Sequence, residues 1–600
     1  MKKFLVLFFA LFLGTSSIFA QVSVDPNENF YTLVESWELR GLISEVPPLR
    51  PFPLSVIRDI LQTVIEKGNE RDVSNAQMYW EKVTGKPWNA SLETRVSYKK
   101  DINESGFGKA LVGLYPDVNG DITLFDNFVS IGYHLGMAVY NNSVSDYLPV
   151  YENDLHDGLT DSANLGPFEA FWDMNDVLAL GTKNIFIQTG IYRSGYGPFL
   201  ASGLALNDNS YHKTNFSFTT IHPKWSYTQQ YSTIGATTSY DGSDQAPDKY
   251  IAFHALEFKP FPFLSFSYYE TIVFGKRLDP SYLMPVPYYI AQGIGGYNDN
   301  LQMGILLKVR PVKSLLWATD LFVDDVSANE LVKLNFDTKL RLAAKTGLIY
   351  TPENSYCTRM GFDYMMITPF TYSHWEYDDL NVSAKISPGC FNFQNYTNNG
   401  IPMGSSYPPN SDRICLVIDF LPIPPLHIKV QSSFLRHANI CESFSDEEAL
   451  KLLLGKAGQY ATDGSIYTHP NLEDPDSKLG EHIDTAWDHL NFLNQDHKMY
   501  VLQEGLDVEY AFKKMKWGQV TLKFSYLFEW IKNPGVTNHL YPGGMITKDA
   551  VTGKYVYKGN SYDSTDELLF AVDEAKQDWI DNIGSDQINN FFTLGLRYQF

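Results

Sequence analysis

The residues best suited to recognise a ligand are aromatic rings placed among glycines and amides in two long segments. The first segment reads IYRSGYGPFLASGLALNDNSYHK, and the second reads MPVPYYIAQGIGGYNDN. Tyrosine rings offer flat apolar faces on which sugar C–H groups stack, and nearby Asn and Asp side chains can bind sugar hydroxyls. The candidate ligand-binding residues are Tyr196, Tyr211, Tyr288, Tyr289 and Tyr297. The alternative is that these rings pack within loops or form an aromatic girdle at a membrane interface.

Other chemistry has little support in the sequence. No G-x-S-x-G, H-E-x-x-H or P-loop pattern occurs, so we predict no catalytic residue and no enzyme. DGSIYTHPNLEDPDSKLGEH lacks the regular ligand spacing of a calcium loop, and the cysteines have no C-x-x-C spacing, so we predict no metal and no cofactor. A net charge of −22 disfavours nucleic acid as a partner.

The chain divides into three predicted parts. Residues 1–20 have two lysines, a short apolar run and small residues before Ala20, which is typical of a cleaved signal peptide. After Ala20 no run approaches the roughly 18 apolar residues of a membrane helix. Residues 21–90 are predicted to form a periplasmic helical unit, and residues 91–600 an outer-membrane β-barrel.

Helical periodicity predicts about three helices between residues 25 and 88. SVIRDILQTVIEKG carries its apolar residues on one face and ends at Gly68. SNAQMYWEKVTG has Ser74 and Gln77 in the spacing of a capping box, which predicts a helix start there, and ends at Gly85.

From about residue 91 the period changes to two. In one strand Val520, Leu522 and Phe524 alternate with Thr521 and Lys523. The second face carries ions of both signs in strand after strand, which fits an apolar side facing lipid and a polar side facing a lumen. The predicted strands are 91–100, 109–118, 127–140, 168–180, 183–194, 213–221, 224–234, 249–258, 262–273, 300–309, 312–325, 336–350, 357–377, 413–421, 424–436, 500–512, 515–531 and 590–600.

Connections between these strands alternate between short turns and long loops. This alternation is the signature of an outer-membrane barrel of about 18 antiparallel strands, with periplasmic turns and external loops. The largest loops, 437–499 and 532–589, contain two predicted helices, one in SFSDEEALKLLLGKAG with Ser445 and Glu448 as a capping box, the other in STDELLFAVDEAKQDWI.

The chain ends on an alternating run, NFFTLGLRYQF. We predict that this last strand closes the barrel against the first. Its terminal aromatic residue resembles the signal that the barrel-assembly machinery of the outer membrane reads. The residues of this predicted assembly signal are Phe592, Leu594, Leu596, Tyr598 and Phe600.

The sequence leaves the state of the lumen and the pairing of the cysteines undecided. The predicted inward residues, which include Lys308, Arg310 and Lys523, fit either a water-filled lumen or a lumen closed by ion pairs. The strand count places Cys357 at the opposite rim from Cys390, Cys415 and Cys441. Cys357 should therefore be unpaired, and a bridge would join Cys441 to Cys415 or Cys390.

Three stretches resemble the Wzi family of capsule-assembly outer-membrane proteins. They are WELRGLISEVPPLRPFPLSVIRDIL, YRSGYGPFLASGLALNDNS and NLQMGILLKVRPVKSLLWATDLFVDD. The resemblance implies a periplasmic helical unit, an 18-stranded barrel and a lectin-like role in anchoring exported polysaccharide. The predicted function is therefore non-enzymatic binding of surface polysaccharide by a barrel in the outer membrane, with outer-membrane lipid, surface polysaccharide and the barrel-assembly machinery as partners. The alternative is an outer-membrane porin or substrate-specific diffusion channel.

Overall fold

The computed structural model describes residues 23–85, 87–152, 157–158, 168–199, 203–236, 247–284, 289, 299–325, 340–374, 393–454, 464–467, 472–473, 482–483, 491–541 and 545–600. The predicted signal peptide lies outside these residues. No helix among them is long and apolar enough to cross a membrane.

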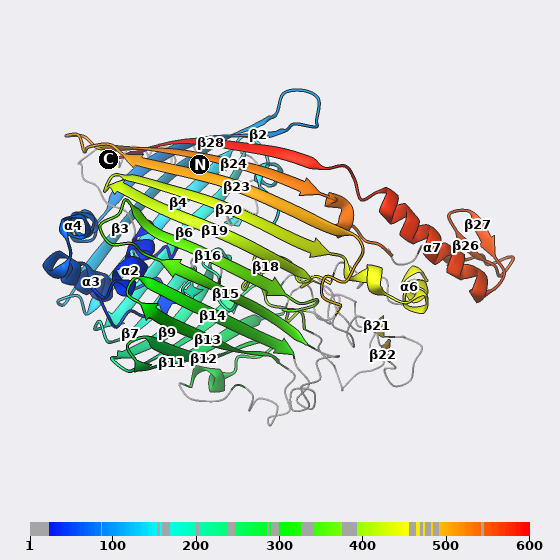
Figure 1. Ribbon diagram of the computed structural model, residues 1–600, viewed down its shortest axis with the longest axis horizontal. Coiled ribbons are helices and arrows are strands. Elements are labelled where there is room, and N and C mark those ends of the chain that lie inside the picture. Colours follow the sequence, from blue (N-terminus) through cyan, green and yellow to red (C-terminus); the bar gives the residue numbers. More distant parts are fainter. Residues whose placement is uncertain are drawn as a thin grey trace, which may run out of the picture.

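Eighteen long strands of the described chain form a closed antiparallel barrel (Figure 1). Their number and order confirm the predicted fold class. The strands are β2 Asn89–Asp101, β3 Lys109–Leu124, β4 Val129–Tyr140, β6 Glu169–Gly181, β7 Ile185–Tyr192, β9 Lys213–His222, β10 Trp225–Ile234, β11 Lys249–Phe261, β12 Leu264–Gly275, β13 Asn300–Val312, β14 Leu315–Asp325, β15 Arg341–Tyr350, β16 Cys357–Ile367, β19 Ser411–Ile423, β20 Leu426–Ala438, β23 Lys498–Ala511, β24 Gln519–Lys532 and β28 Gln587–Gln599.

The last strand closes the barrel. β28 pairs with β24 on one side and with β2 on the other. Phe592, Leu594, Leu596 and Phe600 are exposed on the outer face, as alternation predicts, and Tyr598 is half-buried. The inward positions between them are small or polar, so β28 separates an apolar exterior from a polar lumen.

Short turns lie at one end of the barrel, the turn end. All the long connections lie at the other, the loop end, together with the short connection between β2 and β3. Two predicted strands have clearly wrong ends. The strand predicted at 109–118 is too short, because β3 continues to Leu124, and the strand predicted at 357–377 is too long. β16 ends at Ile367 rather than near 377, because Pro369 cannot donate a ladder hydrogen bond and Phe370 and Tyr372 adopt positive φ angles.

Three helices precede the barrel: α2 Asn29–Leu39, α3 Leu54–Lys67 and α4 Glu70–Thr84. The predicted start of the third helix at Ser74 is wrong. α4 begins one turn earlier, because the Asn69 side chain accepts a hydrogen bond from the backbone N–H of Asp72 and caps the helix there. Gly68 ends α3 as predicted.

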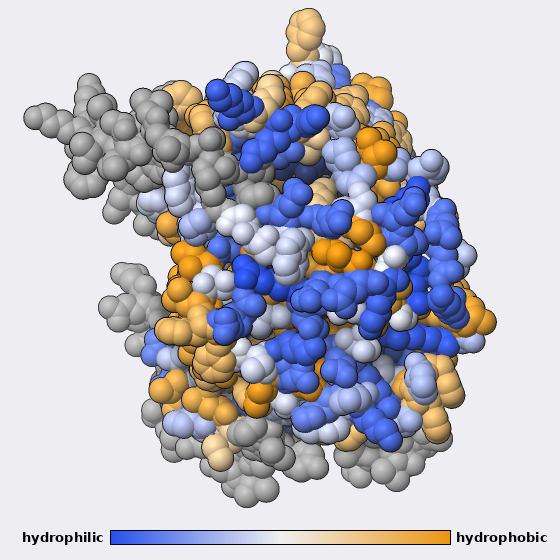
Figure 2. Space-filling view, turned by 90° about the vertical axis from the view of Figure 1, so that its left-hand side faces the viewer, coloured by the Kyte–Doolittle hydropathy of each residue, from blue (hydrophilic) through white to orange (hydrophobic). Residues whose placement is uncertain are grey.

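The helices share an apolar core built around Phe30, Trp37 and Leu61. This core continues into the barrel wall at Phe186, Ile221 and Leu421. They lie at the turn end, where polar side chains cover much of the surface and apolar residues gather at its margin (Figures 1 and 2). Lys183 of a turn pairs with Asp59 at 2.8 Å, and Asn69 donates a hydrogen bond to Asn354 of another turn. The helical unit therefore closes part of this end.

At the loop end, helices α6 Asp446–Leu453 and α7 Thr565–Asp581 extend beyond the barrel (Figure 1). Both were predicted from the sequence. Ser445 and Glu448 form the predicted capping box of α6, and Ser564 caps α7. The helices pack on one another and on the upper ends of β20, β23 and β24, where they form a folded layer.

The thiols of Cys357 and Cys415 are free in this structure. Cys357 lies beside the turn end, as the strand count predicts. The predicted alternative of a bridge from Cys441 to Cys415 is wrong in this structure, because the Cys415 thiol is free. Cys390 lies outside the described residues.

Candidate functional site

One half of the lumen is filled by chain segments that enter from the loop end. The connection between β7 and β9 runs inward and forms β8, Gly195–Tyr196, which pairs with β1, Leu49–Arg50, of the helical unit. A second segment carries β17 Thr397–Asn398 and β18 Ile401–Pro402. Tyr372 and Tyr396 donate hydrogen bonds to the carbonyls of Leu204 and Ala205. Apolar inward side chains of β10 to β16 pack against both segments.

Arg50 joins the helical unit to the first inward segment. Its Nη2 donates to Asp208 Oδ2 at 2.8 Å, and its Nη1 donates to the carbonyl of Gly197 at 2.8 Å. Both charged side chains are buried. Gly195 lies against this pair, and a Cβ there would stand 1.0 Å from Asp208 Oδ1, so only glycine fits.

Helix α2 docks on the barrel wall through apolar contacts, such as Leu39 with Leu316 and Ile349, and through ion pairs. Glu35 pairs with Arg359, and Glu38 pairs with Arg310. Burial raises the pKa of Glu35 despite the Arg359 guanidinium. Burial acts in the same direction on Glu38, but Arg310 and neighbouring lysines outweigh it and hold the pKa of Glu38 below its usual value.

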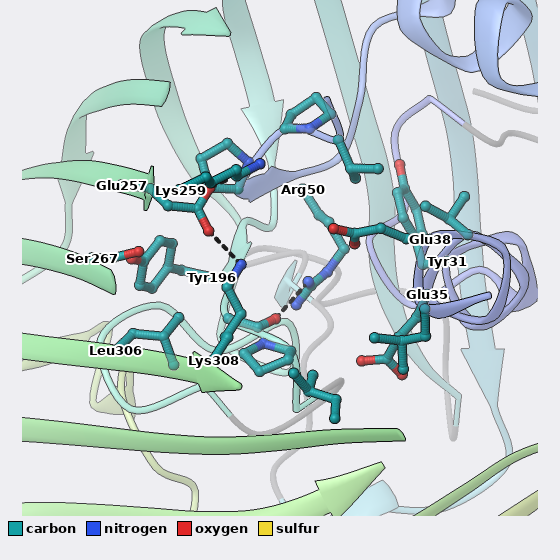
Figure 3. A pocket seen from close by; sticks show the side chains of 18 of the residues that line it. Tyr31, Glu35, Glu38, Arg50, Tyr196, Glu257, Lys259, Ser267, Leu306 and Lys308 are labelled. Carbon is teal, nitrogen blue, oxygen red and sulfur yellow. Dashed lines mark hydrogen bonds and ion pairs between the residues drawn. The ribbon is translucent and has the colours of Figure 1, made fainter. Parts of the chain in front are cut away.

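A cavity of about 80 Å³ lies within this docking interface. Figure 3 shows Glu35 and Glu38 on the helix side, Glu257 and Lys308 on the wall side, and Arg50 near both. Apolar side chains such as Leu39, Leu306 and Leu316 line the same cavity. Ion pairs and apolar contacts therefore both hold the unit in the barrel.

The other half of the lumen is open. A cavity of about 970 Å³, the chamber, extends along β2, β3, β4, β20, β23, β24 and β28. It exists because many inward positions here are small. Its lining includes Ser97, Gly136, Gly361, Gly505, Ser525 and Thr593. On the filled side the corresponding positions carry bulky rings such as Tyr269 and Phe322, which contact the inward segments.

Tyrosine rings and ion pairs line the upper chamber. Tyr115 and Tyr140 pack edge to face at 5.7 Å between ring centroids, and Tyr115 donates a hydrogen bond to Tyr140. Arg413 stacks over Tyr407 at 4.5 Å and pairs with Asp363 at 3.1 Å. Such a surface combines apolar ring faces with donors and acceptors, which suits a hydroxyl-rich ligand.

A second cavity of about 780 Å³ lies nearer the turn end. Residues of the segment Asp25 to Thr32, just before and within α2, line both this cavity and the chamber. The two cavities share eight lining residues: Asp25, Asn27, Glu28, Asn29, Thr32, Asp419, Lys523 and Arg597. The N-terminal segment therefore lies where the two cavities adjoin.

The predicted ligand-binding tyrosines do not line this chamber. Tyr196 is 1% exposed, Tyr211 is 7% exposed, and Tyr289 is fully buried. Their rings pack inside the protein, so they form no exposed platform here. Tyr288 and Tyr297 lie outside the described residues.

The sequence did reveal part of the chamber wall. Inward Lys523 and Arg597 follow from strand alternation, and both line the chamber. Tyr115, Tyr140 and Tyr407 were missed, because neither alternation nor composition shows which part of a lumen stays open. A run of small inward residues on neighbouring strands, such as Ser97, Ser525 and Thr593, is the signal that could have located it.

No protein-family model matches this chain, and no curated protein matches its sequence. Solved structures are similar to it in their barrel architecture. Wzi from Escherichia coli, an outer-membrane protein involved in group 1 capsule assembly and a carbohydrate-binding β-barrel, is 11% identical, with coverage of 96% of this chain and 99% of Wzi and a TM-score of 0.49. OccAB4 from Acinetobacter baumannii is 10% identical, with coverage of 86% and 98% and a TM-score of 0.37. OprD from Pseudomonas aeruginosa is 9% identical, with coverage of 86% and 97% and a TM-score of 0.35.

Proposed function

We propose that this protein is an outer-membrane β-barrel that binds and anchors a surface polysaccharide without catalysing a reaction. The chamber is the observation that carries the proposal. It lies below the long loops, holds about 970 Å³, and combines tyrosine rings with hydrogen-bonding groups. Ligand sites of this volume with a few convergent polar groups are common in proteins.

The partial closure of the lumen fits anchoring. The helical unit and the inward segments fill one half, and the segment Asp25 to Thr32 lines both cavities of the other. A glycan segment that enters the chamber from the loop end would meet this segment before it reached the turn end. The short stretches that resemble the Wzi family imply the same role.

The test is glycan binding to the purified barrel. Tyr407→Ala removes one chamber ring and should weaken binding several-fold, since an aromatic contact is worth about 1 kcal/mol beyond its area. Tyr350→Ala removes a ring that is 44% exposed at the turn end, and it should bind like the wild type. Equal binding by both variants would refute the chamber as the site.

A diffusion channel is the second candidate. The eight residues that line both cavities favour it, because they mark a polar path along one wall from the loop end toward the turn end. Planar-bilayer recordings separate the two functions. A sustained conductance that rises when residues 23–32 are deleted would support a channel, whereas a silent barrel that retains polysaccharide would support anchoring.

A further inference from the structure

A row of polar side chains lies on the outer face of the barrel, where lipid-facing apolar side chains are expected. Gln229 of β10, His254 of β11 and Glu270 of β12 are opposite one another in the strand register. Alternation places them on the same face as Phe258 and Ile305, which are 47% and 40% exposed. The three polar side chains are nevertheless buried, and Glu270 is 0% exposed. Another part of the chain therefore covers the outer wall here.

The connection that follows β12 provides this cover. Residues 276–284, the outer segment, lie against the outside of β10 to β12. The ring of Tyr282 packs on that of Phe274 at 4.7 Å between centroids, and the ring of Tyr289 packs on that of His254 at 4.2 Å. The outer segment is drawn in Figure 1 as the short green coil beside β11 and β12. This long connection thus folds back along the barrel wall.

The polar row satisfies backbone groups of this irregular chain. Gln229 Nε2 donates a hydrogen bond to the carbonyl of Tyr282 at 2.8 Å. The backbone N–H of Tyr289 donates to Glu270 Oε2 at 2.8 Å, and His254 Nε2 lies 3.0 Å from the same carboxylate. Irregular backbone is tolerated at membrane depth only where other groups satisfy its polar atoms. The polar row therefore allows the outer segment to lie where lipid would otherwise contact the strands.

The polar row lies at the depth of lipid acyl chains. The lower aromatic margin on this side includes Phe261 and Phe263, which are 54% and 52% exposed at the turn end. At about 3.3 Å per residue and a strand tilt of about 40°, His254 stands roughly 18 Å above Phe261. The apolar band of an outer-membrane barrel is about 25 Å tall. The outer segment therefore reaches into the upper part of this band.

Apolar side chains of the outer segment face away from the protein. Leu278, Leu283 and Met284 are 61%, 41% and 60% exposed. In water, three exposed apolar side chains on so short a segment are unfavourable. Against acyl chains they continue the apolar exterior that Phe258 and Ile305 form.

The charges of the outer segment lie near its start, next to the loop end. Arg277 pairs with Asp299 and with Asp279, and the Lys276 ammonium lies over the Phe393 ring at 5.1 Å. Charged side chains at this level reach the lipid headgroups and water. The segment therefore changes from charged to apolar as it descends along the wall.

We propose that the outer segment inserts into the outer leaflet of the membrane, with Leu278, Leu283 and Met284 in contact with lipid acyl chains. Lipid is the partner because the segment continues the lipid-facing wall and because the barrel already satisfies its backbone groups. Gln229 and Glu270 are positioning residues that hold the segment against the wall. The segment thereby anchors the barrel at one depth in the membrane, whatever the lumen binds.

The experiment places nitroxide spin labels on the whole barrel in phosphatidylcholine vesicles. Met284→Cys and Leu278→Cys carry the label on the outer segment. Leu594→Cys on the outer face of β28 is the lipid reference, and Val551→Cys, where Val551 is 93% exposed at the loop end, is the water reference. Unsubstituted protein gives the background from the native cysteines.

Two collision reagents report the surroundings of each label. Oxygen concentrates among acyl chains and a nickel chelate stays in water, so the ratio of their collision rates is high in lipid. We expect the ratios at Met284→Cys and Leu278→Cys to match that at Leu594→Cys. They should exceed the ratio at Val551→Cys several-fold.

A second variant tests the polar row. Gln229→Leu removes the donor to the Tyr282 carbonyl and leaves an apolar outer wall. It should raise the mobility of the label at Met284→Cys and shift its collision ratio toward that of water. Thr346→Val is the matched control, because Thr346 is a polar residue on the outer face of β15, where it bonds to Thr319. Heat-modifiable migration on gels verifies that each barrel is folded.

Three results would count against the proposal. Collision ratios on the outer segment that match Val551→Cys would overturn it, because the segment would then lie in water. Low collision rates with both reagents would also overturn it, since they would show that protein, such as a second copy of the barrel, covers the segment. An effect of Gln229→Leu no larger than that of Thr346→Val would refute the positioning role of the polar row.

Discussion

Replacing Arg50 with Met should loosen the helical unit from the barrel, because it strands a buried carboxylate. Asp208 is 1% exposed and accepts hydrogen bonds from Arg50 at 2.8 and 3.2 Å. Breaking a buried pair by removing one partner costs about 3 to 5 kcal/mol. The buried Lys213 ammonium also interacts with Asp208 and offsets part of this cost, so we expect about 3 kcal/mol. That corresponds to roughly a hundredfold shift in the equilibrium between docked and released helices.

A double-mutant cycle isolates the pair. Arg50→Met and Asp208→Asn should each destabilise the docked unit, and the double variant should cost about 2 kcal/mol less than the two changes added together. Urea titration with proteolysis of the helical unit as the readout measures each free energy. Lys313→Met, which breaks a pair with Glu353 in which both side chains are exposed, should cost about 1 kcal/mol or less. Additive effects of the two changes would show that the pair does not hold the unit in place.

Three further predictions concern assembly, acid stability and cysteines. Phe600→Asp should lower the yield of folded barrel far more than it lowers the stability of the barrel that does fold. The folded fraction is measured by heat-modifiable migration on gels, and a wild-type fraction would contradict the prediction. The pKa of Glu38 is lowered in the folded state by Arg310, so the docking free energy that Glu38 contributes is present at neutral pH. That contribution is lost as the pH falls through the folded pKa. Glu38→Gln should therefore weaken docking at pH 7 and flatten the acid end of a profile of urea midpoints against pH. Mass spectrometry of denatured, unreduced protein should find Cys357 and Cys415 alkylated, and a disulfide at Cys357 would contradict the β16 register.

Local patterns in the sequence were sufficient for the barrel frame. Alternation placed all eighteen strands, because lipid on one side and the lumen on the other impose a period of two on each strand. Capping chemistry located α6 through Ser445 and Glu448, since that signal lies within four residues. It misplaced the start of α4, because the Asn69 cap lies upstream of the Ser74 and Gln77 spacing that resembles a capping box.

The contents of the lumen depended on contacts between distant segments. β1 pairs with β8 although Arg50 and its partner Gly195 are far apart in the chain, and Asp208 meets Arg50 from still farther along it. Neither segment shows alternation, because each is surrounded by other parts of the chain and does not bury a single apolar face. The same glycines and tyrosines that suggested an exposed sugar platform, such as Tyr196, are therefore equally suited to close packing inside a barrel.

The sequence by itself determined the strands, their order, the ends at which turns and loops lie, and the polarity of each face, because each of these follows from residues that are close in the chain. Only the tertiary structure decided which half of the lumen is filled and which remains a chamber. That division depends on where the inward segments come to rest, and on whether the side chains that meet them across the barrel are bulky, like Tyr269, or small, like Ser525. Packing across a lumen joins residues hundreds of positions apart, and no local period records it.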